Sequence, residues 1–86
     1  MKHPLSVEGF DGSPKELAGA VGKMRYDRIA EVFKYLAEDL RLQSQGDRAA
    51  GRIKLAAMLE KNSAQLHLAK EQMDEIWKLC EPYMHE

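Results

Sequence analysis

Apolar side chains in the C-terminal part of the chain recur at alternating intervals of four and three residues. The row comprises Leu55, Leu59, Asn62, Leu66, Ala69, Met73, Ile76, Cys80 and Tyr83, and we call it the C-terminal seam. A sustained seven-residue repeat predicts a helix that packs along its length against another helix. We expect this helix to span about residues 48–81, because Asp47 suits the capping position before it and Pro82 favours a stop after it.

A similar row precedes the seam in the middle of the chain. Tyr26, Ile29, Phe33, Leu36, Leu40 and Gln43 follow the same intervals, which predicts a helix over about residues 24–45. Gly46 suits the left-handed conformation that ends many helices, and Asp47 would then cap the next one. Two helices joined by so short a turn are expected to form an antiparallel hairpin.

The N-terminal part predicts one further, short helix. Residues 1–12 mix glycine and proline with polar residues and are expected to be irregular. Ser13-Pro14-Lys15-Glu16 has the pattern of a capping box, which predicts a helix over about residues 14–21. Gly22 is expected to break this helix, the alternative being a helix that continues into the next segment. The predicted fold is all-α, with residues 13–86 in one helical domain.

The two long helices are expected to differ in length. A hairpin folded at Gly46 brings Met24 level with Leu68, so residues beyond about Ala69 lack a partner in the middle helix. An uncovered apolar stripe of this kind marks an interface. Either a second copy of the chain or the apolar residues of the N-terminal part could cover it, the latter being Leu5, Val7, Phe10, Leu17, Ala18 and Val21.

Because two helices alone enclose little interior, we expect a homodimer that forms a four-helix bundle. The expected interface residues are Leu66, Met73, Ile76, Trp77, Cys80 and Tyr83. Asn62 lies on the seam, where it is either a buried polar residue that fixes register or part of a solvated edge. Trp77 is expected to be buried in the oligomer, with burial inside one chain as the alternative.

Composition narrows the function classes. The 86 residues carry a net charge of −1, which gives no overall attraction to nucleic acid or to an anionic membrane. The single cysteine, Cys80, has no partner for an internal disulfide, which suits a reducing compartment. No apolar run is long enough for a signal peptide or a membrane span. We therefore expect a cytoplasmic protein with no membrane partner.

Charges are distributed unevenly along the predicted hairpin. Arg41, Arg48, Arg52 and Lys54 gather at its tip, and Glu71, Asp74, Glu75, Glu81 and Glu86 gather at the far end of the last helix. This order is the reverse of what the helix dipole favours. Either two chains associate antiparallel, so that each tip meets the acidic end of the other, or both ends are simply solvated. The four basic tip residues are also the candidate contacts to a polyanion.

Catalytic and metal-binding signatures are weak. His67 and Glu71 stand four residues apart on one helical face, but two ligands are too few for a metal site, and a surface pair is the expected interpretation. Cys80 has an acidic neighbour and a seam position, which favours a core residue over a reactive thiol. We expect no enzymatic activity, no cofactor and no metal.

The sequence therefore predicts a small self-associating helical module that binds another protein as an adaptor or accessory subunit. The alternative is a nucleic-acid-associated regulator that uses the basic tip. A helix-turn-helix reader needs a short recognition helix, which the long C-terminal helix does not provide, so nucleic acid is the less favoured partner. A site built at a dimer interface, enzymatic or metal-binding, is the third interpretation.

Overall fold

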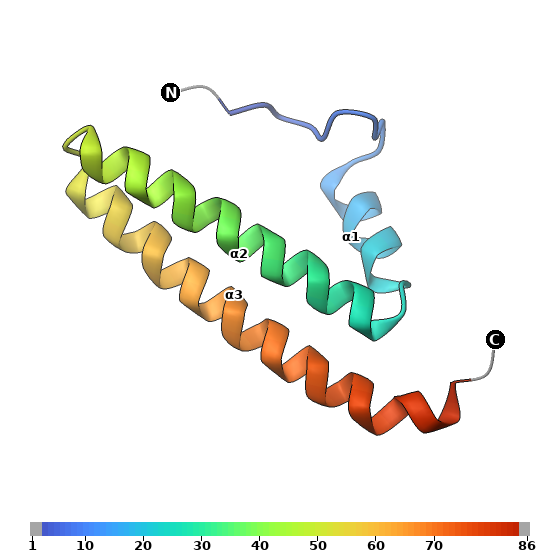
Figure 1. The fold of residues 1–86 in the computed structure, drawn as a ribbon. Coiled ribbons are helices and arrows are strands. Elements are labelled where there is room, and N and C mark those ends of the chain that lie inside the picture. The colour runs from blue at the N-terminus through green and yellow to red at the C-terminus, as the bar shows by residue number, and fades with distance from the viewer. Residues whose placement is uncertain (1–2, 85–86) are drawn as a thin grey trace.

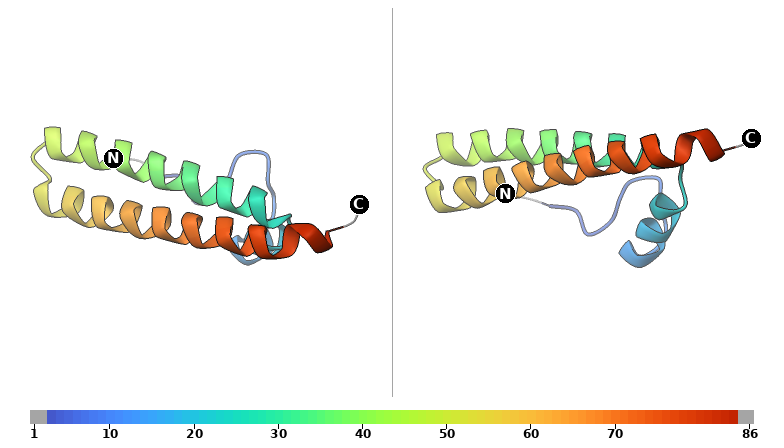
Figure 2. Two further views of the ribbon diagram at one scale, coloured as in Figure 1. Left: turned by 60° about the horizontal axis from the view of Figure 1, so that its bottom comes forward. Right: turned by 90° about the horizontal axis from the view of Figure 1, so that it is seen from below.

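The computed structural model describes residues 3–84. In chain order it contains helix α1 (Pro14–Gly22), helix α2 (Tyr26–Ala49), helix α3 (Ile53–Cys80) and the short 3-10 helix η1 (Glu81–Tyr83). Helices α2 and α3 lie side by side and run in opposite directions, as Figures 1 and 2 show. The described chain is a flat, elongated body of 50 × 30 × 14 Å. The expected all-helical hairpin is thus confirmed.

Helix α1 begins where its sequence predicts. The Ser13 hydroxyl accepts a hydrogen bond from the Glu16 backbone N–H at 3.2 Å, and the Ser13 N–H donates to Glu16 Oε1 at 3.1 Å. These two bonds complete the capping box. The helix ends at Gly22, and the extended backbone of Arg25 (φ −56°, ψ 143°) separates it from α2. Glycine therefore breaks the helix here, and a continuous helix from α1 into α2 does not form.

The hairpin turn lies later in the chain than the sequence indicated. Helix α2 continues through Gly46, and Gly51 is the residue with a left-handed backbone, at φ +84°. The Arg52 N–H donates to the Asp47 carbonyl at 2.8 Å, and the Gly51 N–H donates to the Arg48 carbonyl at 3.0 Å. This is the Schellman pattern, which satisfies the last carbonyls of α2. The expected turn at Gly46 was wrong because Gly51 offers the same conformational freedom one helical turn later.

Asp47 also has a different role from the one expected. It lies in the last turn of α2 and does not precede α3 as a cap. Its side chain is almost fully buried and accepts a hydrogen bond from Arg52 Nε at 2.7 Å. The pair joins the end of α2 to the residue before α3, and it helps to hold the turn closed.

Alanine substitutions at Gly46 and Gly51 distinguish a hairpin turn at Gly51 from one at Gly46. Gly51→Ala places a Cβ on a left-handed residue and should lower the free energy of unfolding by about 1–2 kcal/mol. Gly46→Ala removes a flexible residue from the interior of a helix, with no atom within 4 Å of the new Cβ, and should raise it by about 1 kcal/mol. Urea unfolding of both variants measures the change in the free energy of unfolding. Destabilisation by Gly46→Ala together with stabilisation by Gly51→Ala would place the turn at Gly46.

The later turn removes most of the expected length difference between the long helices. Arg25, just before α2, stacks over the Trp77 ring with its guanidinium carbon 5.0 Å from the ring centroid. The start of α2 therefore lies level with about Ile76, and the end of α3 and η1 extend beyond it. The overhang expected beyond Ala69 is thus shortened to the end of α3 and η1, because the later turn shifts the register of the hairpin.

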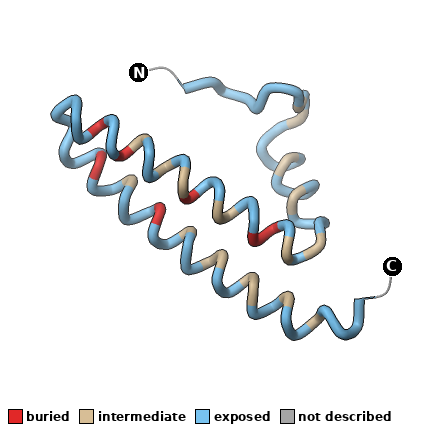
Figure 3. The backbone as a smooth tube through the Cα atoms, viewed as in Figure 1, coloured by how far each residue is buried: buried red, intermediate tan, exposed pale blue. Residues whose placement is uncertain are grey.

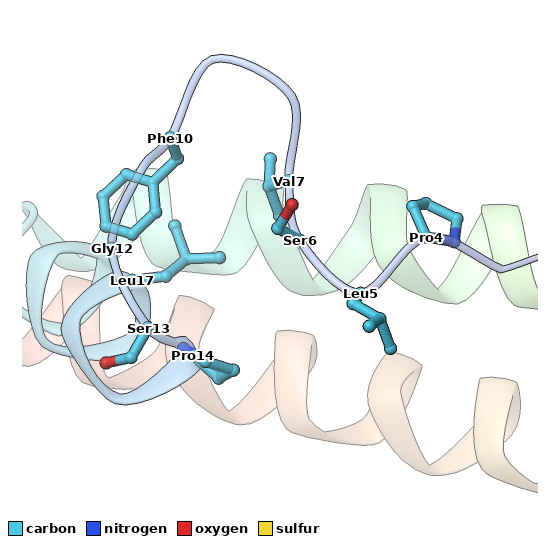
Figure 4. Close-up of a pocket in the computed structure, with 9 residues that line it drawn as sticks. All are labelled: Pro4, Leu5, Ser6, Val7, Phe10, Gly12, Ser13, Pro14 and Leu17. Atoms are coloured by element: carbon cyan, nitrogen blue, oxygen red, sulfur yellow. The ribbon is translucent and has the colours of Figure 1, made fainter.

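The N-terminal residues pack on one another rather than on the hairpin. Phe10 and Leu17 are half-buried and line the same small hollow between the N-terminal segment and α1 (Figure 4). Leu5 is 100% exposed and Val7 is 53% exposed. Within residues 3–84, α1 has no extensive packing with α2 or α3. The N-terminal part therefore leaves the apolar side chains of the hairpin uncovered.

Candidate interaction face

Small side chains make the contact between α2 and α3. Ala30, Ala37 and Ser44 recur at seven-residue intervals on α2, and Ala56 and Ser63 do so on α3. All five are buried, and the buried segments of α2 and α3 lie along the sides on which the two helices face each other (Figure 3). We call the five residues the contact stripe. Small residues allow two helices to approach closely, so this stripe sets the line along which the hairpin closes.

A buried hydrogen bond fixes the register of the contact stripe. The Ser63 hydroxyl donates to the backbone carbonyl of Ala37 at 2.7 Å, across the two helices. Together with Arg25 over Trp77, this bond places Phe33 level with about Leu68. The bond satisfies the buried hydroxyl, which would otherwise destabilise the fold.

The helical repeat carries the larger apolar side chains to one side of the contact. Each residue of an α-helix is rotated by about 100° from the one before it. The residue three positions after a contact-stripe residue therefore lies about 60° around the helix from it. The residue one position before the same contact-stripe residue lies about 100° around the helix, in the same direction. Because α2 and α3 run in opposite directions, the same turn brings both sets to the same side of the hairpin. We call that side the open face.

The open face consists of a central row and an outer row of apolar side chains. The central row is half-buried and comprises Phe33, Leu40, Leu59, Leu66 and Met73. The outer row is exposed and comprises Leu36, Leu55 and Ile76. Val32, Met58 and Leu79 are also exposed and lie at the outer edge of the face, turned about 160° from the contact line in the same direction. Exposure reaches 64% at Met58 and 76% at Leu79. A shallow groove of about 530 Å³ continues the face around α2, and Val32 and Leu36 line it with Tyr35.

The opposite side of the hairpin carries charge. Positions four residues after the contact stripe turn about 40° the other way, and they hold Lys34, Arg41, Arg48, Glu60 and His67. Arg48 Nη2 and Glu60 Oε1 lie 2.9 Å apart and bridge α2 to α3 on this side. On α3, Asp74 accepts a hydrogen bond from Lys70 and raises the pKa of that ammonium. The hairpin is therefore amphipathic across its two broad sides.

The contact between the helices differs from the one expected. The C-terminal seam was expected to face the middle helix, but α3 packs on α2 through Ala56 and Ser63 instead. Leu55, Asn62 and Ile76 are exposed, one residue before each contact position. A seven-residue repeat fits either stripe, and the smaller side chains occupy the closest approach because the helices can come nearer there. Asn62 lies at a solvated edge in the single chain.

The predicted interface residues fall into two groups. Leu66, Met73, Trp77 and Cys80 are half-buried along the line between the helices, whereas Ile76 is 41% and Tyr83 80% exposed. The structure therefore brings Leu66, Met73 and Ile76 onto the open face. Sequence reasoning did not select Val32, Met58 and Leu79, which lie at the outer edge of this face. No apolar repeat marks them, because positions seven residues away, such as Asp39, Gln65 and Gln72, are polar.

Trp77 is held by a charged cluster at the start of α2. Arg25 stacks over its ring and also binds Asp27 through two hydrogen bonds, at 2.8 and 2.9 Å. The hydrogen bonds from the Arg25 guanidinium lower the pKa of the Asp27 carboxyl. The cluster fixes the open end of the hairpin, where the chain enters α2 and leaves α3.

Two of the four basic tip residues form ion pairs within the chain. Arg48 pairs with Glu60, and Arg52 pairs with Asp47 at 2.7 Å. Arg41 and Lys54 are exposed. Two of the four cations are thus neutralised by nearby carboxylates, which weakens the tip as a surface for a polyanion.

The remaining candidate groups do not assemble into a site. His67 and Glu71 are both exposed on α3, and residues 3–84 contain no group of three or more side chains suited to hold a metal ion. Cys80 is half-buried. Within the same range, no helix is both long and apolar enough to cross a membrane. Comparison with protein-family models, with curated proteins and with solved structures found no match to the chain.

Proposed function

We propose that this protein is a helical protein–protein interaction module that self-associates through its open face and acts as an adaptor or accessory subunit. The observation that supports this function is that few apolar residues are buried, whereas many large apolar side chains lie at the surface. The buried apolar residues of the described chain are Ile29, Ala30, Ala37 and Ala56. The larger apolar side chains lie half-buried or exposed on one side of the hairpin, and contiguous apolar surface of this kind is typical of an interface.

A second copy of the chain is the occupant that we propose for the open face. The N-terminal segment leaves it uncovered, because Leu5 and Val7 are exposed and Phe10 packs near Leu17. The open face carries large apolar side chains on both helices, as each half of a four-helix bundle does. A two-fold axis would pair the same surface on both copies, which is the commonest symmetry of soluble oligomers. The conclusion is a homodimeric four-helix bundle.

Thermal unfolding at several protein concentrations tests this proposal. If the folded state is a dimer, its midpoint temperature rises with concentration, because association stabilises only the folded chain. We expect a clear rise between about 1 and 100 μM. A midpoint that stays constant over this range would count against self-association.

The structure gives no comparable support to the nucleic-acid alternative. Its candidate surface is the tip, where Arg48 and Arg52 already bind carboxylates. The charged side of the hairpin alternates both signs, with Glu60 beside Arg48 and Asp74 beside Lys70. A surface of mixed sign gives no continuous track for a phosphate backbone.

A further inference from the structure

We draw no further inference here: the strongest candidate, the shallow apolar groove that Val32, Tyr35 and Leu36 line on α2, continues the open face, and nothing in the structure shows what covers it.

Discussion

Ala37→Leu is expected to lower the free energy of unfolding by about 3 kcal/mol, the largest effect of any single substitution in the hairpin. Ala37 is 0% exposed, and its backbone carbonyl accepts the hydrogen bond from Ser63. The three added carbons have no space at the closest approach of α2 and α3. They would force the helices apart and stretch that bond. Urea unfolding, with the midpoint and slope both fitted, measures the loss.

Ala64→Leu is the matched control for this prediction. Ala64 lies on α3 next to Ser63 but is exposed, and alanine and leucine have similar helix propensities. Its free energy of unfolding should stay within about 0.5 kcal/mol of the parent value. Equal effects of the two leucine substitutions would show that the contact stripe does not set the distance between the helices.

Ile76→Glu is expected to weaken dimerisation by about a thousandfold. Ile76 belongs to the outer row of the open face and is 41% exposed in the single chain. Each copy would lose about 2 kcal/mol of apolar burial, and two-fold symmetry doubles the loss, which corresponds to about three powers of ten in Kd. A carboxylate buried without a partner adds to the effect. Analytical ultracentrifugation over a range of concentrations measures the change.

Leu42→Glu separates loss of the interface from a general effect of added charge. Leu42 is more exposed than Ile76, at 58%. It lies two positions before Ser44, which turns it about 160° from the contact stripe toward the charged side of the hairpin. The substitution adds the same charge and should leave the Kd within about threefold of the parent value. Helical content by circular dichroism should be the same in both variants. Similar weakening by both substitutions would contradict the assignment of the open face.

The elements of the fold were predictable because their signals are local. The capping box at Ser13 and Glu16, the helix break at Gly22 and the seven-residue repeats each depend on neighbouring residues, and the structure contains all of them. The position of the turn was not predictable in the same way. Gly46 and Gly51 both suit a helix end, and the choice depends on contacts between helices that are distant in sequence.

The side of α3 that packs against α2 also could not be predicted from local sequence patterns. Apolar periodicity marks Leu59, Leu66 and Met73 as inward-facing, but it does not say which flank of that row touches the neighbouring helix. Ala56 and Ser63 are buried on the flank that packs against α2. Their small side chains let the backbones of α2 and α3 approach closely. Residues marked by the seam, such as Ile76, consequently remain partly exposed. The apolar surface that the sequence predicted therefore lies along one side of the hairpin rather than on a long overhang, and its role as an interface stays a prediction.

We propose that a second copy of the chain covers the open face in solution. Sedimentation equilibrium of the unaltered protein distinguishes a dimer from a monomer, because the method gives mass without reference to shape. We expect twice the chain mass of 9.8 kDa at micromolar concentrations, with dissociation on dilution. A mass of 9.8 kDa that does not change up to about 100 μM would contradict it.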